Sequence, residues 1–139
     1  MTAEWTDEEL AFLGEAFDLA RQGRDPELID RVRNGLPVNL TNAAGDTLLL
    51  LAAYHGHPGT VAALLAEGAD TGRVNDRGQT ALAAAVFRRD VASTTALLEV
   101  GADPDLGERS ATVIARFFGL GEMSDLLRRA GGAARDADI

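Results

Sequence analysis

The stretch that decides the fold runs from Asn42 to Asp70 and reads NAAGDTLLLLAAYHGHPGTVAALLAEGAD. The stretch from Asn75 to Asp103 lies 33 residues further along the chain, and it reads NDRGQTALAAAVFRRDVASTTALLEVGAD. Both share an Asn, a Gly and a Thr near the start, a Leu-Leu pair and a closing Gly-Ala-Asp, all in the same register. A match that recurs across a whole unit at a period of this length indicates a repeat protein.

Each unit carries the signals of two short helices. Thr47 and Thr80 stand where a side-chain oxygen accepts hydrogen bonds from the first turn of a helix, and apolar residues follow at helical spacing. Pro58 suits the first turn of the second helix in one unit, and Asp90 is placed to cap it in the other. Four leucines of the second helices are expected to be fully buried: Leu64, Leu65, Leu97 and Leu98.

Both units resemble the ankyrin repeat, a likeness carried in the first unit by the stretches 42–57, 64–65 and 68–70. They depart from the Thr-Pro-Leu-His of that family: in the first unit Leu48 replaces the Pro and Leu50 replaces the His. The resemblance implies an all-α ankyrin-repeat solenoid, with about four stacked helix-turn-helix repeats and short β-hairpin loops.

The flanking segments match the two units weakly, as terminal repeats do because one of their sides must face water. Glycines still recur in register, since Gly23 lies 33 residues before Gly56. We therefore expect one ankyrin repeat domain over residues 1–132 and a flexible tail over residues 133–139. The parts of the domain would be an N-terminal capping repeat at 7–38, repeats at 39–71 and 72–104, and a C-terminal capping repeat at 105–131.

The charge of the chain argues against two classes of partner. With 22 acidic and 13 basic residues the net charge is −9, which repels nucleic-acid phosphates and anionic membrane surfaces. The N-terminus lacks the basic start and apolar run of a signal peptide, and no apolar run is long enough to span a bilayer. We expect a monomeric, cytoplasmic chain whose partner is another protein, with no part for nucleic acid or membrane.

No group of residues has the spacing of an active site. Cysteine is absent, which excludes thiolate chemistry and cysteine-based zinc sites. The sequence has neither a nucleophile-elbow motif nor a glycine-rich phosphate loop. His55 and His57 are the two histidines, and no third histidine or cysteine is present to complete a metal site with them. We expect no enzymatic activity, cofactor or metal; the resemblance implies that His57 braces a turn, whereas His55 is expected to be exposed.

The resemblance also implies where a partner would bind, because repeat stacks of this kind use the concave groove formed by their first helices and hairpins. The partner-binding residues expected at the hairpin tips are Asp46, Asp76, Arg77 and Gln79. Those expected near the ends of the first helices are Tyr54, His55, Phe87, Arg88, Phe117 and Phe118.

Among these residues, Tyr54, Phe87 and Phe117 would form one column of aromatic side chains across three repeats. Two interpretations of the column remain open. Aromatic and arginine side chains anchor protein interfaces, which favours a partner surface; rings that lay flat between repeats would instead fill the core. Two functions also remain open: a non-enzymatic protein-binding module with an inhibitor, immunity-type or adaptor role, or alternatively a small-ligand or accessory protein whose aromatic groove holds an apolar molecule.

Overall fold

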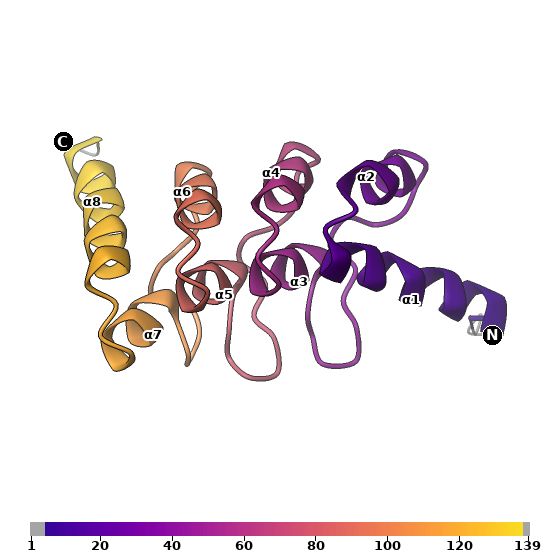
Figure 1. Cartoon of the computed structure of the whole chain (residues 1–139), viewed down its shortest axis with the longest axis horizontal. Helices are drawn as coiled ribbons and strands as arrows, with labels where there is room; N and C mark the ends of the chain where they lie inside the picture. Colours follow the sequence, from indigo (N-terminus) through magenta and orange to yellow (C-terminus); the bar gives the residue numbers. More distant parts are fainter. Residues whose placement is uncertain (1–4, 138–139) are drawn as a thin grey trace.

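Eight helices in four successive pairs make up the described part of the chain, residues 5–137 of a computed structural model (Figure 1). The pairs are α1 (Asp7–Gln22) with α2 (Asp25–Arg33), α3 (Leu48–Tyr54) with α4 (Pro58–Ala66), α5 (Ala81–Phe87) with α6 (Val91–Glu99), and α7 (Ala111–Phe117) with α8 (Gly121–Ala137). Side chains are described up to residue 130. The predicted all-α solenoid of four helix-turn-helix repeats is confirmed.

The helices form two rows. The first helices of the pairs, α1, α3, α5 and α7, pack against one another in chain order, and the second helices, α2, α4, α6 and α8, do the same in a row of their own. Figure 1 shows long loops that extend from the first row on the side away from the second row. The first row and these loops together therefore form one continuous face of the molecule.

The helices α3 and α5 have seven residues each, too few to be stable alone. The hydroxyl oxygens of Thr47 and Thr80 each accept a hydrogen bond from the backbone N–H three residues further on, at 3.0 and 3.1 Å. The first six residues of each helix, 48–53 and 81–86, are buried. The seventh residue, Tyr54 in α3 and Phe87 in α5, is the first to reach the surface. The position of each helix in the repeat therefore determines which side chains of the first row are exposed to water.

Asparagine side chains hold the loops that precede α3 and α5. The Oδ1 atom of Asn42 accepts hydrogen bonds from the backbone N–H groups two and four residues further on, both at 3.0 Å, and Asn75 makes the equivalent bonds at 3.0 and 2.9 Å. In residues 5–137 the only strand-like pairing is an isolated antiparallel bridge between Thr41 and Thr47. The loops are hairpins as expected, since the backbone N–H groups of Asn42 and Asn75 each donate to the carbonyl oxygen four residues further on, at 3.0 and 2.9 Å.

Successive loops are bonded to one another as well. The backbone N–H of Asp76 donates to the carbonyl oxygen of Ala44 at 3.0 Å, and that of Arg109 donates to the carbonyl oxygen of Gly78 at 2.9 Å. Each loop is therefore placed by the loop before it, and the tips form a row alongside the first helices.

Two of the four leucines expected to be fully buried are not. Leu64 and Leu97 are buried completely, whereas Leu65 and Leu98 are only partly buried against the core. Consecutive residues of a helix point about 100° apart, so only one leucine of each pair faces the first row. The other lies on a flank of the second row that water reaches.

The last helix is longer than the sequence suggested. α8 continues through two glycines to Ala137, so residues 133–137 of the segment expected to be a flexible tail are helical. Alanine and arginine in this segment favour the helical backbone; residues 138–139 lie outside the described part. None of the described helices is both long and apolar enough to cross a membrane.

Candidate functional site

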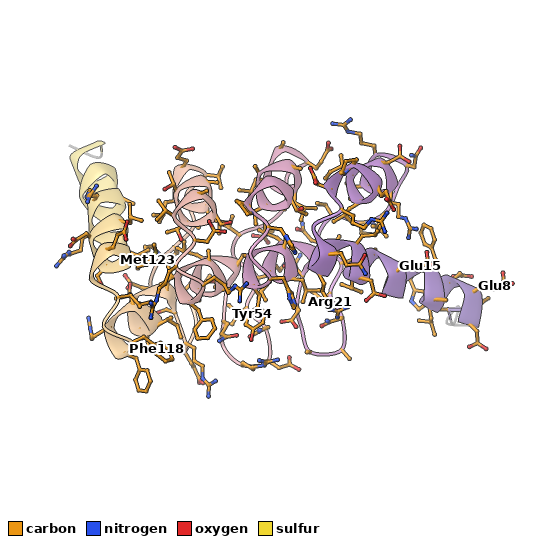
Figure 2. The ribbon with its side chains drawn as sticks, viewed as in Figure 1. Glu8, Glu15, Arg21, Tyr54, Phe118 and Met123 are labelled. Atoms are coloured by element: carbon orange, nitrogen blue, oxygen red, sulfur yellow. The ribbon has the colours of Figure 1, made fainter. Side chains whose placement is uncertain are left out.

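A row of aromatic side chains lies where the first helices end. The rings of Tyr54 and Phe87 are stacked, with centroids 6.2 Å apart and planes 4° from parallel. The ring of Phe118 meets that of Phe87 edge-on, with centroids 5.6 Å apart. Figure 2 labels Tyr54 and Phe118, both on the side of the first row from which the loops extend. We call Tyr54, Phe87 and Phe118 the aromatic row.

The third member of the row differs from the prediction, which placed Phe117 there. Phe117 is 79% exposed and contacts Phe118 edge-on, with centroids 4.9 Å apart. Phe118 follows α7 at the helix-ending position that His55 and Arg88 hold in the two preceding repeats. An aromatic ring at that position covers part of the apolar Phe87 ring, a contact that the hydrophobic effect and the ring quadrupoles favour.

The aromatic row lies at the surface. Phe87 is 42% exposed and Phe118 48% exposed, and Tyr54 is half-buried. In the same helix as Phe87, Leu82 and Val86 are buried. The rings do contact one another across repeats, as the core interpretation supposed, but they keep much of their surface open to water, as the surface interpretation required.

Two hollows flank the row. The hollow on the loop side has a volume of about 490 Å³; all three rings of the row line it together with Phe117, Arg77, Gln79, Arg109, Val113 and Ile114. The hollow on the other side has a volume of about 700 Å³, and it is lined by Phe87 and Phe118 with Gly56, Pro58, Arg88, Arg89, Asp90 and Leu120. Because Phe87 and Phe118 border both, they separate the two hollows.

Of the four residues expected at the hairpin tips, three lie at the surface and one does not. Asp76 and Arg77 are exposed, and Gln79 is half-buried. Asp46 is only 8% exposed, and its Oδ1 atom accepts a hydrogen bond of 2.8 Å from Nδ2 of Asn75. The expectation that Asp46 lies on an exposed tip is wrong, because this carboxylate joins two successive loops.

The two histidines differ in the way the sequence indicated. The Nε2 atom of His57 lies 2.7 Å from the carbonyl oxygen of Arg21, and because a carbonyl can only accept, Nε2 carries the proton. The imidazole also fills the space beside Gly23, where a Cβ atom would lie 2.5 Å from Nδ1. His57 therefore braces the turn of the preceding repeat.

His55 is exposed at the end of α3 and lines a smaller hollow of about 220 Å³ together with Arg21 and Tyr54. Its pKa lies below the ordinary value of 6.5, first because of partial burial and then because of the positive charges of Arg21, His57 and Arg88. No group of three or more histidine and carboxylate side chains in the described residues is placed to hold a metal ion.

Three residues of this face were missed as site residues: Arg21, Arg89 and Val113. Arg21 stands 33 residues before Tyr54 and Arg89 stands 33 residues after Gly56, so the repeat register contained a signal for both. The exposure of Val113 had no such signal. The residue is 44% exposed, on the last first-row helix, where no later repeat of the described chain covers it.

A family model for ankyrin repeats, in three copies, matches residues 17–107. A protein of Pseudomonas aeruginosa strain PAO1 that carries the name ankyrin repeat protein is 54% identical over 50 residues. The aligned stretch makes up 36% of this chain and 29% of that relative, so most of the relative lies outside the match.

Proposed function

The chain belongs to the ankyrin-repeat family, and from this premise we propose that it binds another protein along the aromatic row without catalysing a reaction. Ankyrin repeats are in general protein-interaction modules, and repeat stacks bind their partners on the extended concave face. In this chain, the corresponding face is formed by the first helices of the four pairs and by the loops.

The observation that carries the proposal is the continuity of the exposed aromatic row. Tyr54, Phe87 and Phe118 come from three successive repeats and contact one another in series. Water-exposed aromatic surface is unfavourable in a chain that acts alone, and contiguous apolar patches mark interaction sites. Aromatic side chains are also enriched among the residues that dominate binding energy at protein interfaces.

The roles expected from the sequence, as inhibitor, immunity-type partner or adaptor, all begin with the same step. Each requires a partner held against this face, and they differ in what the partner does once bound. We also propose that the chain is monomeric and cytoplasmic. The net charge of −9 favours a monomer, because like charges keep copies of the chain apart.

A small apolar ligand is the second candidate, since the loop-side hollow of about 490 Å³ has the size of small-molecule sites. The extent of the aromatic surface favours a protein. Phe87 and Phe118 continue beyond that hollow and line the second one as well, so the surface exceeds what one small ligand in one hollow would cover.

Parallel capture from a lysate of the source organism tests the proposal. The baits are the wild-type chain, Phe87→Ala and Val100→Ala, a matched control because Val100 is an exposed apolar residue in the second row. We expect a stoichiometric partner that the wild type and Val100→Ala retain and that Phe87→Ala loses. A partner held equally by all three would overturn the proposed surface, and native mass spectrometry that found only a bound small molecule would support the second candidate.

A further inference from the structure

Arginines stand on both sides of the aromatic row. Phe87 and Phe118 separate the two hollows, and each hollow contains a pair of guanidinium groups. The pair in the loop-side hollow is Arg77 with Arg109, and the pair in the other is Arg88 with Arg89. A ligand bound to the aromatic row would therefore lie between two positively charged pairs of arginines, one in each hollow.

Salt bridges distinguish these four arginines from six others of the chain. Six arginines of the chain each form a salt bridge with an aspartate or glutamate: Arg21, Arg24, Arg31, Arg33, Arg73 and Arg128. The four beside the aromatic row form none with residues 5–130, and neither do Arg116 and Arg129, which line neither hollow. In a chain with 22 acidic residues, the four arginines beside the aromatic row thus have no ionic partner among residues 5–130.

The backbone of Arg89 provides an independent observation. It is left-handed, with φ of 57°, in the turn between α5 and α6. The equivalent turns of the repeats before and after contain Gly56 and Gly119, with φ of 75° and 65°. A non-glycine residue in this conformation is strained, and such strain clusters at functional sites. The arginine is therefore retained against the preference of the backbone, at the edge of the hollow.

A carboxylate is the group that fits these arginines best. The planar guanidinium presents parallel N–H donors that match the two oxygens of a carboxylate. One internal carboxylate, that of Asp90, also borders the second hollow, but it is engaged: its two oxygens accept hydrogen bonds from the backbone N–H and hydroxyl of Ser93, at 3.2 and 2.7 Å. The guanidinium groups remain available to an external ligand.

We infer that the groove selects an acidic segment of its partner protein, whose carboxylate side chains bind the four flanking arginines while its apolar side chains cover the aromatic row. This inference rests on the proposed function and specifies the chemistry of the partner. The net charge of −9 disfavours a long polyanion such as nucleic acid, which would be repelled by the whole surface. A short acidic segment needs only the local positive charge.

Selection from a random peptide display library tests the inference without knowledge of the natural partner. Peptides are selected on the immobilised wild-type chain, and the affinity of each is then measured for Phe87→Ala, Arg89→Gly and Arg129→Ala. Arg89→Gly removes the charge while giving the turn the residue that its backbone prefers, so lost binding cannot be ascribed to lost folding. Arg129, which is exposed on α8, serves as the control for net charge.

We expect selected peptides to be enriched in Asp and Glu over the unselected library, to bind Arg89→Gly about tenfold more weakly, and to bind Arg129→Ala as they bind the wild type. Peptides that depend on Phe87 but show no acidic enrichment, or that bind Arg89→Gly as tightly as the wild type, would overturn the inference and leave the proposed function intact. If acidic peptides depended on Arg89 and not on Phe87, the aromatic row would fail as the binding surface while recognition of acidic segments would stand.

Discussion

The rings of Tyr54 and Phe87 lie parallel, 6.2 Å apart between centroids, at equivalent positions of neighbouring repeats. Each is the last residue of a seven-residue helix whose other six residues are buried. The repeat register thus brings successive rings to one edge of the groove, and it would do so for any side chains at these positions. That this chain has aromatic residues there is a property of its sequence and not a requirement of the fold.

The unequal burial of paired leucines predicts unequal costs of truncation. Leu97→Ala should lower the free energy of unfolding by about 2–5 kcal/mol, the range for fully buried leucines. Leu98→Ala should cost roughly half as much, because Leu98 is only partly buried and leaves a smaller cavity. Urea denaturation of the two variants provides the comparison, and equal losses would show that the second row is packed differently.

The bond between Asn75 and Asp46 predicts a strong effect of a small change. In Asn75→Asp, a second carboxylate would face the buried Asp46 in place of an amide donor, with an expected loss of about 2–3 kcal/mol at neutral pH. The loss should shrink in acid, where one carboxyl of the pair takes up a proton.

Asn42→Asp is the matched control for that change. Asn42 holds its own loop through Oδ1, an acceptor that Asp keeps, and among the described residues its Nδ2 donates to no carboxylate. Thermal denaturation of both variants at neutral and acidic pH should therefore show a large, pH-dependent loss at position 75 and a small one at position 42. Similar losses at the two positions would contradict the role assigned to the inter-loop bond.

The left-handed backbone of Arg89 predicts a stabilising substitution. Arg89→Gly should raise the free energy of unfolding by about 1 kcal/mol, because glycine adopts this conformation without strain. Arg88→Gly, one residue earlier, should instead be destabilising, since Arg88 has φ of −77° and there is no strain to relieve. Chemical denaturation distinguishes the two, and a destabilised Arg89→Gly would mean that the arginine side chain supports the fold.

The lowered pKa of His55 predicts a titration that can be followed by NMR. Since partial burial and three positive neighbours disfavour the protonated imidazole, His55 should titrate below 6.5, the ordinary value for histidine. Arg88→Ala should move the pKa upward without restoring it fully, because burial is the larger cause. A folded-state pKa below that of the unfolded chain makes the fold less stable as the pH falls from above 6.5 through the folded-state value. An unchanged His55 titration in Arg88→Ala would contradict the assigned contribution.

The sequence was sufficient for the fold because the repeat register fixes both helices of a unit. Thr47 and Thr80 cap their helices as predicted, and His57 braces the preceding turn. These features depend on local spacing, which is readable from one chain. The loop between α6 and α7 is three residues shorter than the loop between α4 and α5, and the sequence shows this because Ser110 follows Thr80 by 30 residues and not by 33.

The candidate site was only partly predictable, because its details depend on contacts between repeats. Spacing alone placed Phe117 in line with Phe87, but the ring that touches Phe87 belongs to Phe118. Spacing likewise placed Asp46 on a tip, where its bond to Asn75 of the next loop instead buries it. Side-chain direction at a helix end and pairing between loops are set by three-dimensional packing, for which the repeat pattern has no signal.

Phe87→Ala tests whether the aromatic row is a binding surface, when the stability of the variant and its affinity for the selected peptides are measured together. Because Phe87 is 42% exposed, we expect a loss of about 1 kcal/mol in stability, or about 3 °C in Tm, and at least a tenfold loss of affinity. Leu82→Ala, a buried change in the same helix, should show the reverse: a loss of about 2–5 kcal/mol in stability with affinity retained by the folded fraction. A Phe87→Ala variant that melted as low as Leu82→Ala and still bound the peptides like the wild type would show that the aromatic row packs the fold and is not a binding surface.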